Sequence, residues 1–362
     1  MMKFNGFEKG MGIGGWLTNY KRFNVLPENR RMDLTVGDFE HFNSYITEND
    51  VKYIASLGLD HIRLGFDQIV VEESPYVYRE SIMQLIEKFV CNCRKYKLNV
   101  VLNLHKAVGN YCDIAESKSL LDDSELQKRF IAMWEYFEKY FKDFPEVAFE
   151  LLNEVRDTDS SKWNELAEKT LKSIRSINPE RKVIIGSTLW NNVNTLKDLK
   201  LYDDKNVIYT FHTYEPFSFT HQQGVLMDGP MYYNRKMPYP GDIERYRDYE
   251  RVVGNNEKSY EGFDAMDKNF IHKNLQPAVD FMKNNPDKIL WCGEFGTIRH
   301  CKLEWRENWM HDVIEFFIDN NIPYCVWNYL STPNDGNRFS LVDDDTRQIL
   351  SDNLAKIIRG EV

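Results

Sequence analysis

The sequence is dominated by a regular alternation between short apolar runs and longer segments whose apolar residues recur at helical spacing. Continuous apolar runs of this length are typical of parallel strands buried on both faces. Eight such strands alternating with helices predict a (β/α)8 TIM barrel of the α/β class, and no GxGxxG motif follows the first run to suggest an open dinucleotide-binding sheet. Helical spacing is clearest within 82–90, 163–174 and 305–317. The apolar runs lie at 11–15, 61–66, 100–104, 147–152, 183–186, 207–211, 289–293 and 324–327.

One segment interrupts this alternation. Between residues 213 and 269 the sequence has no clear strand and is rich in Tyr, Gly, Pro and charged residues. A loop of this length inside a compact domain is usually functional. We therefore expect one domain over residues 1–362, with 213–269 inserted after the sixth strand as a wall or lid on the catalytic face.

Charge and hydropathy limit the partners of this chain. The 46 Lys and Arg residues are outnumbered by 56 Asp and Glu residues, which argues against nonspecific binding to nucleic acid. No stretch approaches the roughly 18 to 20 consecutive apolar residues of a membrane span, so we expect no integral membrane protein. No apolar stretch of signal-peptide length follows Met1. This predicts a cytoplasmic protein, or a secreted one if a leader has been removed.

The cysteine pattern predicts a reduced protein without structural zinc. No CxxC pair occurs, and Cys91 and Cys93 are too close on a helical segment to bridge. We expect every cysteine to be reduced and most to be buried, as in a reducing compartment, and we predict no metal or other cofactor. The six cysteines are Cys91, Cys93, Cys112, Cys292, Cys301 and Cys325.

Polar side chains gather at the C-terminal ends of the predicted strands, where (β/α)8 barrels carry their chemistry. Each alone has an ordinary explanation, such as an ion-pair partner, a hydrogen-bonded core histidine or a core tryptophan. Together they are harder to explain, because packing does not require six strands to place polar residues at one rim. The residues are Arg63, His105, Asn153, Glu154, His212, Tyr214, Glu294, Trp327 and Asn328.

Two carboxylates at this rim, Glu154 and Glu294, indicate cleavage of a glycosidic bond. This reaction needs one protonated carboxyl group to release the leaving oxygen and one ionised carboxylate to attack the sugar or to activate water. Arg63 beside one carboxylate would keep it ionised, while an Asn and aromatic rings beside the other would let it hold its proton. The reaction needs no metal, in agreement with the missing metal-ligand motifs.

The same positions carry motifs by which the chain resembles glycoside hydrolase family 5, whose members share the (β/α)8 barrel. The resemblance runs from about Gly12 to Tyr329. The motifs are Ile62-Arg63-Leu64, Leu151-Leu152-Asn153-Glu154, Phe211-His212-Thr213-Tyr214, Trp291-Cys292-Gly293-Glu294-Phe295-Gly296 and Val326-Trp327-Asn328-Tyr329. The chain also resembles a subgroup of clostridial endoglucanases in two segments, Pro216-Phe217-Ser218-Phe219-Thr220-His221-Gln222 and Tyr233-Asn234-Arg235.

The resemblance implies a retaining β-glycosidase that acts by double displacement on β-1,4- or mixed β-1,3/1,4-linked glucan, as oligosaccharide or polysaccharide. Glu154 would be the general acid/base and Glu294 the nucleophile. The implied binding residues are Asn153 for the sugar 2-hydroxyl, Arg63 and Tyr214 for holding Glu294, His212 for orienting Glu154, His105 for sugar hydroxyls, Trp327 as the floor under the sugar, and Trp190 as an acceptor-side stacking platform.

Two residues depart from the family pattern. Many relatives carry two adjacent histidines after the third strand, whereas this chain has His105-Lys106. The relatives' Asn before Pro-Phe is here Glu215, which adds a third acid to the rim. These changes leave both carboxylates in place but open the question of which sugar is bound.

The sequence leaves three other functions open. A glycosidase of the same fold could act on mannan or β-1,3-glucan, or as an exo-acting β-glucosidase. A metal-dependent barrel hydrolase would draw ligands from His61, His105, His212 and His272, although the chain lacks an HExxH helix and an HxH pair after its first strand. A non-catalytic sugar-binding protein would keep the barrel and lose turnover, although both glutamates are present.

Overall fold

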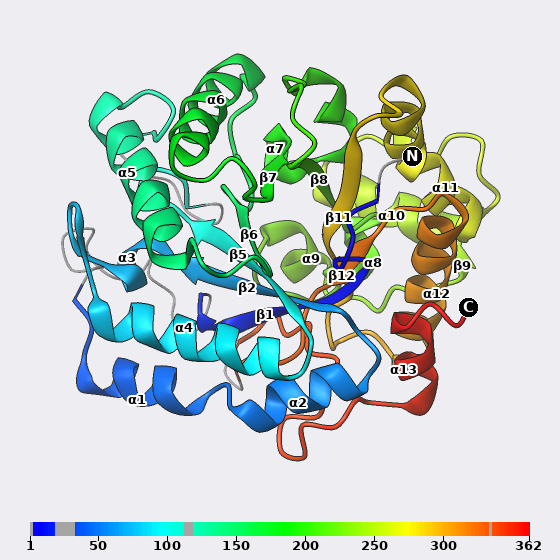
Figure 1. Cartoon of the computed structure of the whole chain (residues 1–362). Helices are drawn as coiled ribbons and strands as arrows, with labels where there is room; N and C mark the ends of the chain where they lie inside the picture. Colours follow the sequence, from blue (N-terminus) through cyan, green and yellow to red (C-terminus); the bar gives the residue numbers. More distant parts are fainter. Residues whose placement is uncertain (1–2, 19–32, 112–118, 333–334) are drawn as a thin grey trace.

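Eight parallel strands form the centre of the protein. The computed structural model describes residues 3–18, 33–111, 119–332 and 335–362, and within them the strands close into a barrel in the order β1-β12-β11-β8-β7-β6-β5-β2 (Figure 1). All eight predicted strands are confirmed, and the fold is the (β/α)8 TIM barrel. The strands are β1 (Lys9–Leu17), β2 (His61–Asp67), β5 (Asn99–Lys106), β6 (Val147–Glu150), β7 (Val183–Gly186), β8 (Val207–Thr213), β11 (Ile289–Phe295) and β12 (Tyr324–Val326).

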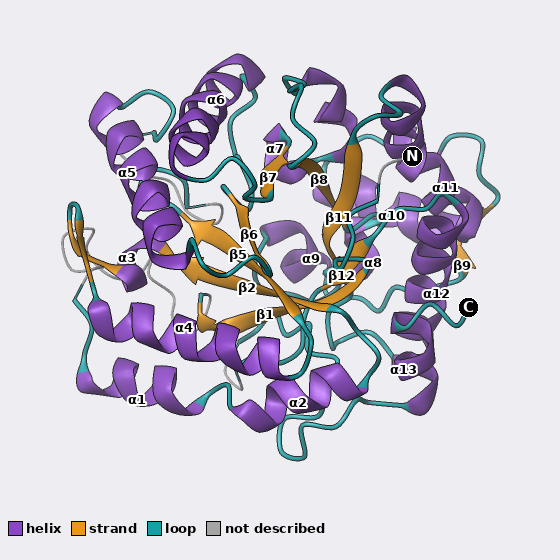
Figure 2. Ribbon diagram, in the orientation of Figure 1, coloured by secondary structure: helices purple, strands orange, loops and turns teal. Residues whose placement is uncertain are grey.

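Helices cover the outside of the barrel (Figure 2). The helical spacing predicted from the sequence is confirmed in α4, α6 and α12, each of which buries its apolar face. Aspartates cap several helix starts, among them Asp123, which accepts hydrogen bonds from the backbone at the start of α5, and Asp159, which does so at α6. The helices that follow strands are α1 (Val36–Ser44), α2 (Glu48–Ser56), α3 (Gln68–Val71), α4 (Glu80–Lys95), α5 (Ser124–Phe141), α6 (Ser160–Ile177), α7 (Thr188–Asn191), α11 (Lys268–Asn284), α12 (Leu303–Asp319) and α13 (Asp352–Ile358), with a 3-10 turn η3 (Val193–Asp198) and a small hairpin, β3 (Glu72–Ser74) and β4 (Val77–Tyr78).

Several strands extend beyond the apolar runs that predicted them. We expected Arg63, His105, His212 and Glu294 at or just past the strand ends, but all four lie within β2, β5, β8 and β11, and Arg63 lies well before the end of its strand. The strands continue because the backbone ladder pairs N–H and C=O groups whatever the side chain is. The polar side chains therefore begin inside the barrel mouth rather than above it.

The segment that we expected to be a loop without clear strands is folded. It includes α8 (Phe217–Thr220), α9 (Asp228–Tyr233), α10 (Ile243–Val253), a 3-10 turn η4 (Lys258–Tyr260) and a two-stranded antiparallel sheet of β9 (Gly241–Asp242) and β10 (Ala265–Met266). Its tyrosines are largely core residues: Tyr246 lies 6.2 Å from Tyr260, whose ring lies 5.4 Å from Phe270 on α11. The aromatic content of this segment thus holds it together and attaches it to the barrel helices.

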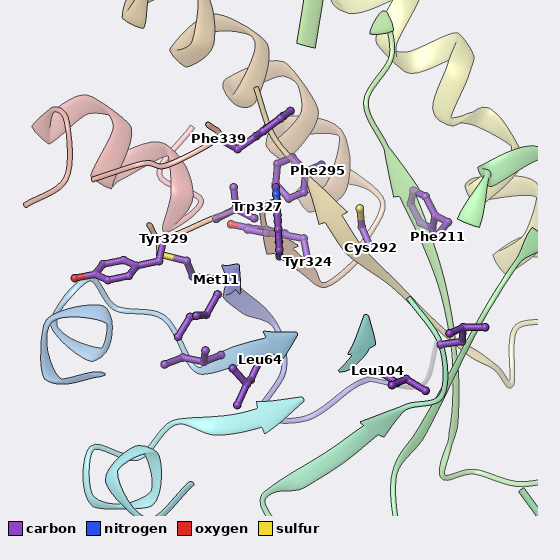
Figure 3. Close-up of a cluster of buried hydrophobic side chains, with 14 of the residues drawn as sticks. Met11, Leu64, Leu104, Phe211, Cys292, Phe295, Tyr324, Trp327, Tyr329 and Phe339 are labelled. Carbon is purple, nitrogen blue, oxygen red and sulfur yellow. The ribbon is translucent and has the colours of Figure 1, made fainter. Parts of the chain in front are cut away.

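The core has two parts. The larger part fills the space between strands and helices, and Figure 3 shows a region of it around Met11, Leu64 and Phe295. The smaller part closes the N-terminal end of the barrel interior, where Phe4 and Phe7 stack at 4.3 Å ahead of β1. It consists of Phe4, Phe7, Val101, Ala148, Ile184, Ile208, Ile289, Trp291 and Cys325.

Two further sequence expectations concern membrane helices and cysteines. None of the helices in the described residues combines the length and the apolarity needed to cross a membrane. The five described cysteines are free, and Cys93, Cys292, Cys301 and Cys325 are buried while Cys91 is exposed. Cys112 lies outside the described residues.

The barrel end closed by Phe4 and Phe7 allows a test of the core. Phe7 is 1% exposed, so Phe7→Ala should lower the free energy of unfolding by about 3–5 kcal/mol through lost burial and a residual cavity. Denaturant unfolding measures this, with Val36→Ala at a 77% exposed position as the control. A loss below about 1 kcal/mol, as is typical of surface substitutions, would mean that the Phe7 ring does not close this end.

Candidate active site

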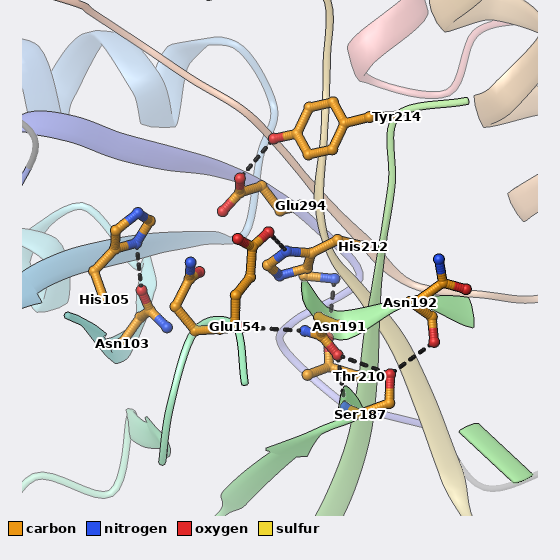
Figure 4. A network of polar contacts seen from close by, with 12 residues as sticks. Asn103, His105, Glu154, Ser187, Asn191, Asn192, Thr210, His212, Tyr214 and Glu294 are labelled. Carbon is orange, nitrogen blue, oxygen red and sulfur yellow. Dashed lines mark hydrogen bonds and ion pairs between the residues drawn. The ribbon is translucent and has the colours of Figure 1, made fainter. Parts of the chain in front are cut away.

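The polar residues predicted from the strand ends meet at the C-terminal mouth of the barrel (Figure 4). Glu294 is on β11, and Glu154 lies in the loop that follows β6. One carboxylate oxygen of each glutamate and one ring nitrogen of His212 all lie within 4.8 Å of one another. Two acids that are distant in sequence therefore face each other across a narrow gap.

Glu294 is held by one donor on each oxygen. Arg63 Nη1 donates to Oε2 at 2.7 Å, and the Tyr214 hydroxyl donates to Oε1 at 2.6 Å. Burial, and then the adjacent Glu294 charge, raise the pKa of Tyr214 well above its usual value, so the hydroxyl keeps the proton that it donates. The Glu294 side chain is only 8% exposed. Its carboxylate is thus fixed in position and paired with positive charge.

Arg63 connects Glu294 to the rest of the site. Its guanidinium group is fully buried and donates to Glu150 through Nε at 2.7 Å and Nη2 at 2.9 Å, and Nη2 also donates to Asn153 Oδ1 at 2.5 Å. Burial alone would lower the pKa of Arg63, but Glu150 and Glu294 outweigh that effect and the pKa is raised. Arg63 therefore stays charged at all relevant pH values.

Glu154 has a different environment. Its Oε1 lies 2.9 Å from His212 Nδ1, and its side chain is 17% exposed. Burial lowers the pKa of His212 to about 4, despite an opposing effect of Glu294. The imidazole is therefore neutral at neutral pH and places no positive charge beside Glu154. The backbone around Glu154 is fixed by Asn110 Nδ2, which donates to the Glu154 carbonyl at 2.7 Å.

Trp327, which directly follows β12, lies against His105 of β5. The two rings stack at 5.4 Å with an interplanar angle of 13°, and His105 Nδ1 lies 3.0 Å from Asn103 Oδ1. Burial, followed by the charge of Arg63, lowers the pKa of His105 well below its usual value, so this ring is also neutral. The indole fits because β1 has glycines beneath it: a Cβ on Gly12 or on Gly14 would lie 2.7 Å from a Trp327 ring carbon.

The four histidines of the metal hypothesis do not come together. His61 pairs with Asp60 at the start of β2 and lies 5.8 Å from Trp291 in the smaller core, while His272 packs on Phe316 at the barrel exterior. In the described residues, ligand-type atoms converge in two places, at Glu154, His212 and Glu294 in the barrel mouth and at His311, Asp312 and Glu315 on α12. The fixed charge of Arg63 at 2.7 Å from Glu294 already supplies that carboxylate with its cation, which disfavours a metal ion at the same place.

Residues 24–332 match the sequence profile described as cellulase (glycosyl hydrolase family 5). The chain belongs to glycoside hydrolase family 5. It is 36% identical over 330 residues to Endoglucanase C of Acetivibrio thermocellus, and the alignment covers 89% of this chain and 91% of that protein. It is 30% identical over 327 residues to Cellodextrinase A of Ruminococcus flavefaciens, and that alignment covers 89% of this chain and 85% of that protein.

Solved structures agree on the fold of this family 5 glycoside hydrolase. A crystal structure of endoglucanase Cel5A from Thermotoga maritima superposes with a TM-score of 0.71 at 24% identity, covering 98% of this chain and 97% of that one. The family and its relatives identify the protein as an endoglucanase-like glycoside hydrolase.

The other predicted residues lie at the rim or beside it. Trp190 is 49% exposed on α7, and its backbone N–H donates to the Val155 carbonyl at 3.0 Å, next to Glu154. Lys106, which departs from the family pattern, is buried at the end of β5 and is in register with Asp67 of β2. Glu215 is exposed, and its Oε2 accepts a hydrogen bond from the Phe217 backbone at 3.2 Å.

Sequence reasoning gave no role to Glu150 or to the glycines of β1. Glu150 had a usable signal, because it is a charged residue at the end of an otherwise apolar strand and lies four residues before Glu154. The glycines had a weaker one, since Gly12 and Gly14 alternate along a strand that buries all other residues after its first. Neither signal predicts which residue on another strand Glu150 or the glycines contact.

The close approach of β1 to Trp327 predicts a specific defect. In Gly14→Ala the new Cβ would lie 2.7 Å from two indole carbons and 2.8 Å from Asn328 Nδ2, so the ring must move. Misplacing a binding group by about 1 Å can cost roughly 100-fold, and we expect kcat/KM on cello-oligosaccharides to fall by about 10- to 100-fold. Gly37→Ala, whose Cβ has no neighbour closer than 3.8 Å, is the matched control. Equal kcat/KM in the two variants would show that the glycine does not position the ring.

Proposed function

We propose that this family 5 enzyme is a retaining β-glucanase that cleaves its substrate by double displacement. Retaining glycosidases place their two carboxyl groups about 5 to 5.5 Å apart, whereas inverting enzymes need about 6.5 to 9.5 Å to admit water between them. The approach of Glu154 and Glu294 oxygens to within 4.8 Å is the observation that carries this proposal. A gap of this size suits direct attack by one carboxylate on the sugar.

In the first step, a Glu294 oxygen attacks the anomeric carbon and Glu154 gives its proton to the leaving glycosidic oxygen. The bond from the anomeric carbon to that oxygen breaks, and a glycosyl-enzyme ester forms. Arg63 and Tyr214 hold Glu294 in place for this attack by donating one hydrogen bond to each of its oxygens. The neutral His212 suits Glu154 as the acid, since it adds no charge that would favour loss of the proton.

In the second step, Glu154 takes a proton from a water molecule, and the water oxygen attacks the anomeric carbon. The ester bond to Glu294 breaks, so the sugar leaves with its original anomeric configuration and both glutamates return to their starting states. The 17% exposure of the Glu154 side chain, twice that of Glu294, fits the need for water on this side.

The residues around the two acids support sugar binding. Asn153 Oδ1 accepts from Arg63, so the amide NH₂ group is the end that donates to the sugar 2-hydroxyl. Trp327 forms the floor under the sugar, with His105 stacked beside it. The exposed Trp190 ring, attached next to Glu154, serves as the acceptor-side platform.

The relatives support a β-glucan substrate. Endoglucanase C and Cellodextrinase A, which this chain resembles over most of its length, carry names that refer to glucan and cellodextrin cleavage. We propose β-1,4- or mixed β-1,3/1,4-linked glucan, as oligosaccharide or polysaccharide, as the substrate.

Replacing each of the two glutamates by alanine should change the activity in a different way. Glu294→Ala should abolish turnover of every substrate, because no glycosyl-enzyme can form. Glu154→Ala should keep much more of its activity on aryl cellobiosides with good leaving groups than on cello-oligosaccharides, because a good leaving group needs little protonation. Steady-state kinetics on both substrate types checks this. Equal losses on the two types in both variants would contradict the assigned roles.

The wild-type protein tests the proposal as a whole. It should hydrolyse cello- and mixed-linkage oligosaccharides faster than manno- or laminari-oligosaccharides, and proton NMR should detect the β-anomer of the new reducing end first. The sizes of the products separate internal from terminal cleavage. Initial release of the α-anomer would rule out the double displacement, and a preference for manno-oligosaccharides would rule out the glucan substrate.

A further inference from the structure

Glu150 is the least explained ionisable group near the site. It is fully buried at the end of β6, and both of its oxygens accept hydrogen bonds from one edge of the Arg63 guanidinium. Burying a carboxylate is costly unless it is paired and hydrogen-bonded. Without Glu150, Arg63 would still be paired with the carboxylate of Glu294. The need to pair Arg63 therefore does not by itself explain why Glu150 is an acid.

Glu150 changes both the geometry and the charge of the site. Its bidentate contact occupies Nε and Nη2 of Arg63, so Nη1 is the nitrogen that donates to Glu294. Arg63 therefore cannot make a bidentate contact with Glu294 as well. It also makes the set of Arg63, Glu150 and Glu294 carry a net charge of one negative unit. With Glu150 neutral, that set would be a balanced ion pair.

This difference matters for the proposed reaction, on which the inference rests. The transition state has oxocarbenium-like positive charge on the sugar, and a site with excess negative charge stabilises it better than a neutral site. A carboxylate held by a fully available guanidinium is also a weaker nucleophile, because its charge is already neutralised. We propose that Glu150 is a positioning residue that neutralises and orients Arg63, so that Glu294 keeps its negative charge available for attack.

Several other ionisable groups lie near Glu150 and Glu294. Arg63 is the permanent cation, and the Cys292 and Cys325 thiols stay protonated because burial raises their pKa. The histidines are neutral and Tyr214 is protonated, as described above. The groups that act on Glu150 or Glu294 are Arg63 from β2, Glu154 after β6, His212 from β8, Tyr214 after β8, Cys292 from β11 and Cys325 from β12. On β5, His105 is acted on by Arg63 and by Lys106. The pH dependence of kcat/KM should therefore report the charge of Glu150.

The sign of the expected pH effect follows from the charge. Removing a negative charge stabilises nearby anions, so Glu150→Gln should move the pH dependence of kcat/KM to lower pH. The enzyme needs Glu294 ionised and Glu154 protonated. Both the acidic and the alkaline limbs of the kcat/KM profile should therefore move to lower pH, by about one unit for a charge at this range.

The fold offers a matched control. Glu138 on α5 makes the same bidentate contact with Arg181, at 2.7 and 3.0 Å, and both side chains are at most 1% exposed. Glu138→Gln thus removes an equally buried charge from an equally buried pair away from the two catalytic-position glutamates. It should cost stability without moving either limb of the pH profile.

The experiment measures kcat, KM and pH profiles of Glu150→Gln, Glu150→Asp and Glu138→Gln on an aryl cellobioside. We expect Glu150→Gln to lower kcat by about 100-fold with KM changed less than threefold, and to shift both limbs down. Glu150→Asp, which keeps the charge, should restore the wild-type limbs. The positions of the limbs do not depend on how much enzyme is folded, and if Glu150→Gln fails to fold, wild-type limbs in Glu150→Asp together with a kcat loss support the proposal, while shifted limbs contradict it.

Unshifted limbs in Glu150→Gln, with a kcat equal to that of Glu138→Gln, would overturn the role of Glu150. That outcome differs from failure of the proposed function, which would appear in the wild type as release of the α-anomer or as absence of β-glucan hydrolysis.

Discussion

The site is organised around one buried positive charge. Arg63 is inaccessible to solvent, and a guanidinium in that position must be paired on nearly every donor to be tolerated. Its partners come from β6 and β11, which are separated from β2 by other strands on either side of the barrel. The contacts join strands on both sides of β2, so they form only once these strands have come together in the barrel.

The two glutamates acquire different environments from their positions relative to the strand ends. Glu294 lies within β11, where it is surrounded by barrel side chains and held by Arg63 and Tyr214. Glu154 lies four residues beyond the end of β6, where it is more open and contacts a neutral imidazole. A few residues of chain thus place one carboxylate against a fixed cation and the other against an uncharged partner. The proposed division into nucleophile and acid follows from this placement.

Local patterns predicted the strands, the exterior helices and the rim residues, because burial on both faces and helical spacing leave clear marks on a sequence. The predictions were less good where structure depends on contacts between distant strands. Glu150 looks like an ordinary strand residue until register brings it against Arg63, and Gly14 matters only because Trp327 lies across it. The helix α10 was missed because its buried residues are one isoleucine and two tyrosines in a segment rich in charged residues.

The proposed sugar floor lies where the last barrel strand meets the first. Trp327 follows β12 and rests on the bare backbone of β1, two elements that are far apart in the sequence. During synthesis on the ribosome the glycines emerge well before the indole that covers them. The cleft that we propose for the sugar therefore lacks its floor until β12 has been made and has docked against β1.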